Sequence, residues 1–356
     1  RTLRDIGALD RQGNPTGIGL QIARLPVEPR SGRILIAARD EHCLAEMLPI
    51  VAALETNDPR ERPAEKAREA DAAHAKWRDA ESDFIGLLRM WRDVWAPSLR
   101  KGLQKRGGLE LKPLIAKALQ MGDELHNRPV AASSLFANAM AVAMVEAGVA
   151  GAPLLGTLKY ITAHELLCLG LSMAAGKASA DPAKGIPFST VVVAMARNGT
   201  EFGIRVSGLG EEWFTAPSPR VNGLYLPGYS ENDAGCDMGD SAITETVGWG
   251  GFVLAGATGI LALVGGTPEE AMKYSQDMRQ ITVSASPNYR MPIFGFQGSP
   301  VGIDIRKVVQ TGICPVIDTA IAHKNPGYPI IGAGLVRAPL ECFQKALKAF
   351  GQKYMK

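Results

Sequence analysis

Cysteine is scarce in this chain: five of its 356 residues, widely spaced and in no C-x-x-C pair. An odd number at such spacing argues against a disulfide framework and against a structural zinc site. The pattern is typical of proteins from a reducing compartment. We therefore expect a cytoplasmic protein with no metal ion and no cofactor.

An excess of charge of either sign is also absent. The formal net charge is +3: the first 97 residues contain 15 Lys and Arg against 16 Asp and Glu, and the remainder contains 24 against 20. Neither part is a basic domain, so we expect neither nucleic acid nor a membrane surface as a partner. The chain begins at Arg1 and shows no signal peptide. We expect it to be a fragment of a longer reading frame.

A nucleotide-binding loop is missing as well. The nearest match, GLSMAAGKAS at residues 170–179, has five residues between its glycines and Ala178 where a P-loop needs Ser or Thr. It also lies in an apolar helical pattern rather than after a strand. No ATPase activity is expected.

One long uncharged stretch, residues 247–266, has the length of a membrane span. Seven of its 20 residues are glycine, and no basic residues flank it. We expect a close-packed core segment rather than a span.

A β-hairpin is the clearest local prediction. Residues 189–196 and 200–207 are strand-like runs on either side of Asn198-Gly199, which favours a type I′ turn. The simplest interpretation is a turn alone. The alternative adds a polar cluster at this end that faces a substrate, made of Arg197, Asn198, Glu201 and Arg205.

Residues 109–126 show helical spacing and end in a polar tip. Asp123 and His126, three apart, would share a helix face and could orient a general base or hold a metal ion. The alternative is a histidine that caps the helix. Asp240 or Ser241 is expected to cap a further helix, either as a cap alone or as part of an anion site.

Further elements are expected toward the C-terminus. Residues 301–309 and 313–322 read as strands, and alternation would place Asp304 and Arg306 on one face of the first. Residues 330–337 read as a glycine-rich turn and 339–350 as an amphipathic helix. Thr267 begins a capping box with Pro at the first helical position.

Two strings near the N-terminus, LPVEPRSGRILIAA and NDPRERPAEKAREADAAHAKWRDAESDF, resemble the region beyond the motor of HrpA-type DEAH-box RNA helicases. The resemblance covers residues 1–88 and implies an all-α helical bundle, in which Pro63 opens a long charged helix. No motor lobe or helicase motif is found in the chain. An RNA-binding role of this segment is one alternative function.

From about Leu88 onward the chain resembles the YlbE-like family. The strings that carry the resemblance are LKPLIAKALQMGDELHNR, VVVAMARNGTEFGIRVSGLGEEWFTAP, GDSAITETVGWGGF, GSPVGIDIRKVVQTGICPVIDTAIAHK and GAGLVRAPLECF. We expect residues 89–356 to form a mixed α/β globular domain of glycine-rich strands and packed helices, without the family's own N-terminal part. Two unrelated families that meet without a linker favour recombination or an assembly artefact at residues 84–95.

The resemblance implies the large subunit of an oxamate carbamoyltransferase, which acts with partner subunits on oxalurate, oxamate and carbamoyl phosphate in allantoin catabolism. Such chemistry needs cations, oxyanion donors and a proton carrier. The expected catalytic residues are His126, His323 and Asn198. The expected substrate-binding and anion-binding residues are Arg197, Gly199, Arg205, Asp240, Ser241, Asp304 and Arg306. The alternative is a non-catalytic assembly subunit of the same complex.

Overall fold

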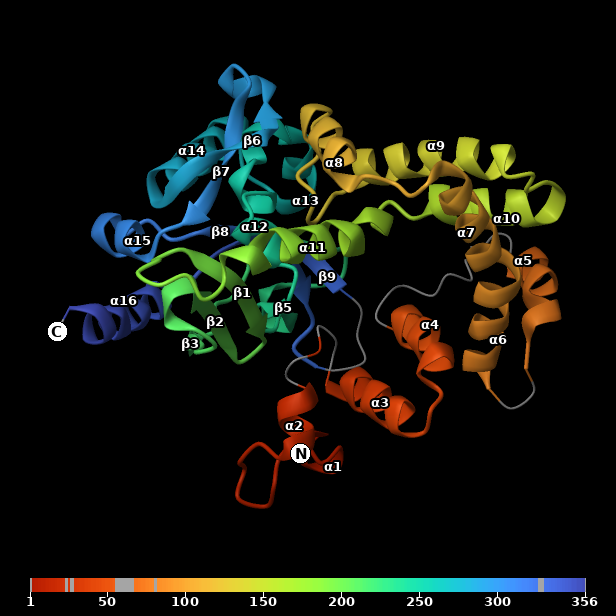
Figure 1. Ribbon diagram of the computed structural model, residues 1–356, viewed down its shortest axis with the longest axis horizontal. Helices are drawn as coiled ribbons and strands as arrows, with labels where there is room; N and C mark the ends of the chain where they lie inside the picture. The colour runs from red at the N-terminus through yellow and green to blue at the C-terminus, as the bar shows by residue number, and fades with distance from the viewer. Residues whose placement is uncertain are drawn as a thin grey trace. The chain divides into compact units, whose positions relative to one another are not determined.

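A computed structural model describes residues 2–22, 25, 29–54, 67–79, 82–325 and 330–355. The chain divides into two compact units (Figure 1). Unit 1 comprises residues 1–108 and 140–160, and unit 2 comprises residues 109–139 and 161–356. The boundary between residues 88 and 89 that the two resemblances suggest stays a prediction.

Unit 1 is helical in its described part, as expected for the N-terminal segment. Its elements are α1 (Thr2–Asp5), α2 (Gly17–Ile22), α3 (Pro29–Asp40), α4 (Leu44–Leu54), α5 (Ala67–His74), α6 (Asp83–Met90), a π-helical turn (Trp91–Trp95), α7 (Ala96–Arg106) and parts of α9 (Val130–Glu146) and α10 (Gly151–Ala163). A small core forms around Ile22 and Ile36. Trp95 stacks on Tyr160 with ring centroids 4.2 Å apart. Pro63 lies outside the described residues.

In its described residues, unit 2 has three antiparallel sheets (Figure 1). The first has the order β3-β2-β1-β5, the second β4-β9-β8, and the third is the β6–β7 pair. The strands are β1 (Val192–Asn198), β2 (Glu201–Val206), β3 (Phe214–Pro217), β4 (Asn222–Tyr225), β5 (Met238–Gly239), β6 (Thr282–Met291), β7 (Gln297–Ile303), β8 (Val316–Ala322) and β9 (Ile330–Arg337). Helices and antiparallel strands therefore share one unit, which confirms the expected mixed fold.

Helices that lie wholly or partly in unit 2 pack around these strands. They are α8 (Leu111–Gln120), the first part of α9, α11 (Leu167–Ala180), α12 (Ile243–Thr246), α13 (Leu261–Val264), α14 (Pro268–Ile281), α15 (Ile305–Thr311) and α16 (Leu340–Tyr354). Apolar side chains of β2, β8, β9, α14 and α16 join in one buried cluster. A second cluster gathers side chains from α8 and from the segment around Trp249.

The predicted hairpin is present, but its turn differs in type. Arg197 pairs with Phe202, so Gly199 and Thr200 are the central residues. Only the first of these two has a positive φ, +81°. A positive φ at the first central residue alone is the pattern of a type II′ turn, with Gly at that position, so the type I′ prediction was wrong.

The uncharged stretch 247–266 folds as short helical turns. Residues 248–257 lie largely in the core, as predicted, whereas Thr258, Gly259, Ala262, Leu263 and Gly266 are exposed. Trp249, Phe252, Leu254 and Ile260 are fully buried. Among the described residues no helix is both long and apolar enough to cross a membrane.

Four further predictions about local structure were confirmed in the type of element. The capping box at Thr267 begins α14, with Glu270 N–H donating to its hydroxyl at 3.2 Å. The stretch 170–179 lies inside α11 rather than in a phosphate loop. Val316–Ala322 forms β8, and α16 follows Pro339.

Three predictions need correction. The expected strand 301–309 ends at Ile303, because the Asp304 carboxylate accepts a hydrogen bond from Arg306 N–H and caps α15. Residues 330–337 form strand β9 and not a turn, because their backbone pairs with both β4 and β8. The helix expected over 109–126 is shorter and ends at Gln120.

Candidate functional site

Arg197, expected to bind an anion, lies in the core of unit 2. Its side chain is fully buried, and Nε donates to Asp237 Oδ2 at 2.8 Å. Nη2 donates to Thr319 Oγ1 at 2.8 Å and to Ser241 Oγ at 3.4 Å. Nη1 donates to the carbonyl of Gly239 at 3.3 Å. The guanidinium therefore cross-links β1, β8 and the loop between β4 and α12.

The other hairpin residues do not gather around Arg197. The Asn198 side chain is exposed and accepts the N–H groups of Thr200 and Glu201, at 2.9 and 2.7 Å. Gly199 N–H donates to the carbonyl of Asp237 at 3.1 Å, so it is already used within the fold. Asn198 thus stabilises its own turn.

Arg205 faces the other end of β2. It forms an ion pair with Glu211, donates to the carbonyl of Gly210 at 3.3 Å and lies over the Trp213 ring, 5.7 Å from its centroid. The predicted polar cluster at the hairpin end is therefore not assembled.

The remaining predicted residues are also dispersed. Arg306 is exposed and pairs with the buried Asp304 at the start of α15, 2.7 Å from Nη2 to Oδ2. The half-buried His323 follows β8, accepts Asn325 N–H at 3.0 Å and packs edge-on against Tyr229.

Asp240 and Ser241 do not cap a helix. The N-cap of α12 is Ala242, and no side chain caps this four-residue helix. The prediction that one of them caps a helix was therefore wrong, whereas anion binding by Asp240 and Ser241 stays a prediction.

His126 is the predicted residue that lies in a dense polar network. Because α8 ends at Gln120, the segment 121–129 is a connection to α9, and Asp123 and His126 do not share a helix face. Instead, Asp123 Oδ1 accepts Leu125 N–H at 2.9 Å and Oδ2 accepts Ala132 N–H at 2.8 Å. The carboxylate therefore fixes the connection at both ends.

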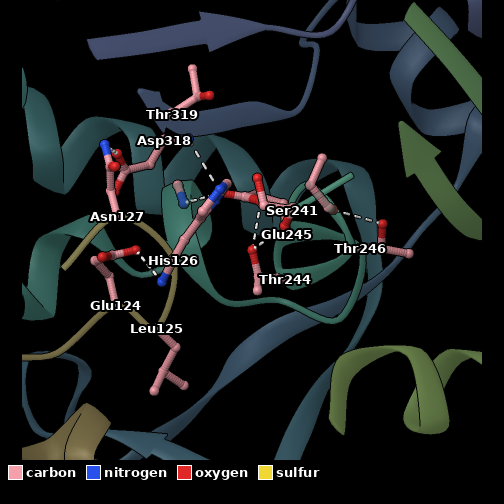
Figure 2. A network of polar contacts seen from close by, with 12 residues as sticks. Glu124, Leu125, His126, Asn127, Ser241, Thr244, Glu245, Thr246, Asp318 and Thr319 are labelled. Atoms are coloured by element: carbon pink, nitrogen blue, oxygen red, sulfur yellow. Dashed lines mark hydrogen bonds and ion pairs between the residues drawn. The ribbon is translucent and has the colours of Figure 1, made fainter. Parts of the chain in front are cut away.

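The backbone of this connection is strained at a buried position. Leu125 has φ +70°, in the region that side chains other than glycine rarely adopt. Its N–H is held by Asp123, and its carbonyl accepts the hydroxyl of Ser172 at 2.8 Å. Figure 2 shows the Leu125 side chain pointing away from the polar groups, while Glu124 and His126 point among them.

A histidine–glutamate pair lies at the centre of the network. His126 Nδ1 is 2.8 Å from Glu245 Oε1, and both side chains are almost completely buried, at 4% and 0% exposure (Figure 2). The same oxygen accepts Gly251 N–H at 3.0 Å, and Glu245 Oε2 accepts the Thr244 hydroxyl at 2.9 Å. A carboxylate bound in this way fixes the imidazole orientation.

A second pair of carboxyl groups lies beside the first. Glu124 Oε2 accepts His126 N–H at 2.8 Å, and its Oε1 accepts Arg128 N–H. Asp318, on β8, accepts Asn127 Nδ2 at Oδ1, 2.9 Å away, while its Oδ2 is buried without a hydrogen-bond donor. The side chains of Asn127 and Arg128 are half-buried and adjoin the network.

Burial separates these carboxyls into two kinds. Burial raises the pKa of Glu124 well above its usual value, and the negative charges of Asp318 and Asp123 raise it further. Burial also raises the pKa of Asp318, to about 6. Burial opposes the charge on Glu245 too, but His126 and its hydrogen bond, the Gly251 N–H and the positive charge of Arg197 together outweigh burial, so the Glu245 pKa is lowered. Glu245 is therefore ionised at neutral pH.

The ionised Glu245 determines the His126 tautomer. An acceptor at Oε1 requires the proton on Nδ1, so in the neutral imidazole the lone pair is on Nε2. This arrangement suits a general base whose second nitrogen is held by a carboxylate. The described residues contain no group of three or more His, Cys, Asp or Glu that could hold a metal ion.

Sequence reasoning did not select five members of this network and also did not select Asp237, the partner of Arg197. The five members are Glu124, Asn127, Arg128, Glu245 and Asp318. One available signal was the glycine spacing after Glu245, in TETVGWGG. A Cβ on Gly250 would lie 2.0 Å from Glu245 Oε1 and 3.2 Å from His126 Cβ, so the network needs glycine there. The pairing with segments more than a hundred residues away gave no local signal.

Comparison with known proteins identifies relatives of this chain. The family model described as oxamate carbamoyltransferase subunit AllG matches residues 52–241. This match begins upstream of residue 88, where the resemblance was expected to start. The Escherichia coli oxamate carbamoyltransferase subunit AllG is 42% identical over 272 residues, which cover 76% of this chain and 65% of that protein.

Two further relatives cover a similarly large share of the chain. The Escherichia coli uncharacterized protein YahG is 45% identical over 274 residues, or 77% of this chain and 58% of that protein. A crystal structure of a conserved protein of unknown function from Enterococcus faecalis V583 is 43% identical, with a TM-score of 0.72 over 78% of this chain and 67% of that one. The chain thus spans about three fifths of the two curated relatives.

Helicases match over a shorter stretch. The HrpA RNA helicase of Escherichia coli is 38% identical over 96 residues, which cover 26% of this chain and 7% of that protein, and the Haemophilus influenzae homologue is 37% identical over 99 residues. This partial similarity agrees with the resemblance of the N-terminal segment. By the match over more than half of its length, the chain belongs to the family of the oxamate carbamoyltransferase subunit AllG.

Proposed function

We propose that the chain is a subunit of a carbamoyltransferase that acts on oxalurate, oxamate and carbamoyl phosphate in allantoin catabolism. One observation carries the proposal. In a chain of the AllG family, two segments 119 residues apart bring His126 Nδ1 within 2.8 Å of Glu245 Oε1 in a buried pair, an arrangement that in the neutral ring places the lone pair on Nε2.

The chemistry of the transfer needs such a group. When the amide nitrogen of oxamate attacks the carbamoyl carbon, a C–N bond forms, the bond from carbon to the phosphate oxygen breaks, and the nitrogen loses a proton. His126 Nε2 would accept that proton, while Glu245 stabilises the resulting imidazolium. Asn127 and Arg128, which follow His126 in the connection, would hold the carboxylate or phosphate of the substrate.

The dispersed residues have weaker support. Arg197, Gly199, Asp304 and Asn198 already have partners within the fold. Their expected contacts with substrate stay proposals. His323 also remains a proposal as a second proton carrier.

The second candidate is a non-catalytic assembly subunit, and the burial of the network favours it. Side chains that are 4% and 0% exposed can stabilise the core without meeting a substrate. Thermal unfolding of the full chain with oxalurate, oxamate or carbamoyl phosphate separates the two functions. A catalytic subunit binds at least one ligand and its Tm rises with ligand concentration. A constant Tm with all three, and turnover by the partner subunits without this chain, would support the assembly role.

A further inference from the structure

Four carboxyl groups are buried close together in unit 2 with few cations to balance them. They are Asp123, Glu124, Glu245 and Asp318, and the titratable basic group among them is His126. Arg197 is nearby but is paired with Asp237. An ionised carboxylate that is buried without compensation takes up a proton instead.

The hydrogen bonds indicate which carboxyl group needs that proton. Glu245 is saturated by donors, and both oxygens of Asp123 and of Glu124 accept backbone N–H groups. Asp318 Oδ2, in contrast, is fully buried and has no donor. A hydrogen bond with the Glu124 side chain is among the causes that lower the Asp318 pKa, so the two carboxyl groups are neighbours. A proton on Glu124 therefore supplies the donor that Asp318 lacks.

We propose that Glu124 and Asp318 hold one proton between them at neutral pH, and that this acid pair positions His126. The link is direct: Glu124 Oε2 accepts the His126 N–H, and Asp318 Oδ1 holds the neighbouring Asn127. Glu124 is thus a positioning residue. The role in turnover rests on the function proposed above for His126, whereas the shared proton does not.

Loss of the proton weakens the structure around residues 121–129. Two adjacent buried carboxylates then repel each other at the point where the strained Leu125 must be held. Glu124 and Asp318 both have a higher pKa in the folded protein than in the unfolded chain. The stabilisation by the shared proton is therefore fully present below the carboxyl pKa of the unfolded chain, about 4. It is lost as the pH rises through the pKa values of the folded protein. For Asp318 that folded value is about 6.

The test compares Glu124→Gln and Asp318→Asn with the wild type and with Glu110→Gln, a matched change at an exposed position. The unfolding equilibrium constant is measured between pH 5 and 8. In the wild type and the Glu110→Gln control, the unfolding equilibrium constant should rise more steeply with pH than in the two variants. The difference in slope should be up to about tenfold per pH unit. Parallel slopes in all four proteins would overturn the proposal.

Infrared difference spectroscopy provides a direct readout on the full chain. The wild type at pH 7 should show a protonated carboxyl band that Glu110→Gln retains and Glu124→Gln or Asp318→Asn loses. Absence of that band from the wild type would also overturn the proposal. If Glu124→Gln does not fold, the Asp318→Asn profile and the wild-type spectrum decide the outcome.

Turnover of the assembled complex tests the positioning role separately. In a plot of kcat against pH, the pH at which kcat falls on the alkaline side should shift in Glu124→Gln and stay unchanged in Glu110→Gln. An unshifted fall in a complex that turns over contradicts the positioning role. No turnover by the wild type contradicts the proposed function and leaves the stability and infrared results to judge the acid pair.

Discussion

At the scale of single residues, the network depends on a glycine that lets two side chains approach the backbone. Gly250 has φ +58°, and a Cβ there would overlap Glu245 Oε1 at 2.0 Å. Its N–H also donates to the carbonyl of Glu124 at 2.7 Å. The position therefore joins the α12 segment to the connection that carries His126.

Alanine at position 250 should therefore be costly. We expect Gly250→Ala to lower the free energy of unfolding by at least ~2 kcal/mol, from the positive φ together with the displaced carboxylate. Gly351→Ala is the control, because that glycine is helical and a Cβ there meets nothing within 4 Å. The control should gain up to about 1 kcal/mol. Equal effects in chemical denaturation would show that Gly250 is not required by the network.

The residues also show why the site was hard to predict. His126 was identified because a polar tip ends an apolar helical pattern, and it does join a network. Arg197 was selected for the same reason, a charge in apolar surroundings, yet it is fully buried in an ion pair. A charge beside an apolar run predicts burial with a partner, but sequence does not say whether that partner is Asp237 or a ligand.

At the scale of secondary-structure elements, Arg197 connects strands that do not pair with each other. It lies on β1, which belongs to the four-stranded sheet, and donates to Thr319 on β8, which belongs to the three-stranded sheet. Asp237 completes the link by accepting from both, at 2.8 Å from Arg197 and 3.1 Å from Thr319. The buried pair thus contributes to the packing of the two sheets.

Removal of one partner should destabilise unit 2 strongly. Arg197→Met leaves the carboxylate of Asp237 buried alone, which is expected to cost about 3–5 kcal/mol of unfolding free energy. Arg39→Met breaks an ion pair whose side chains are 56% and 58% exposed, and it should change stability by less than about 1 kcal/mol. The double variant Arg197→Met/Asp237→Leu should recover part of the loss in urea denaturation. A mild effect of Arg197→Met alone would argue against a structural role.

The elements themselves were predictable where the signal was local. The hairpin, the capping box of α14 and helix α16 follow from turn, cap and periodicity patterns. The strand expected to continue past residue 303 failed because the side chain of Asp304 captures the N–H of Arg306 and begins a helix. Strand β9 was predicted to be a turn because it is rich in glycine. Glycine is common in turns, but it also occurs in strands where a neighbouring backbone approaches closely.

At the scale of the whole molecule, the chain combines two kinds of sequence. Most of it matches the AllG family and a protein of known structure, and about a quarter matches RNA helicases. The division into two compact units does not follow the boundary at residues 88 and 89 that the two resemblances suggest, because unit 1 also includes residues 89–108 and 140–160. Family and fold could be predicted from long matching strings. The partners of a buried side chain, which depend on tertiary packing, could not.

The role proposed for His126 is to carry a proton in a carbamoyltransferase reaction. The most direct measurement is the rate of carbamoyl phosphate formation from oxalurate and phosphate by the full chain assembled with its partner subunits. In His126→Asn the side-chain amide can still donate to Glu245, but no ring nitrogen remains to carry the proton. We predict that kcat falls at least a hundredfold while the complex assembles and its Tm changes little. A kcat within twofold of the wild type would contradict a proton-transfer role of His126.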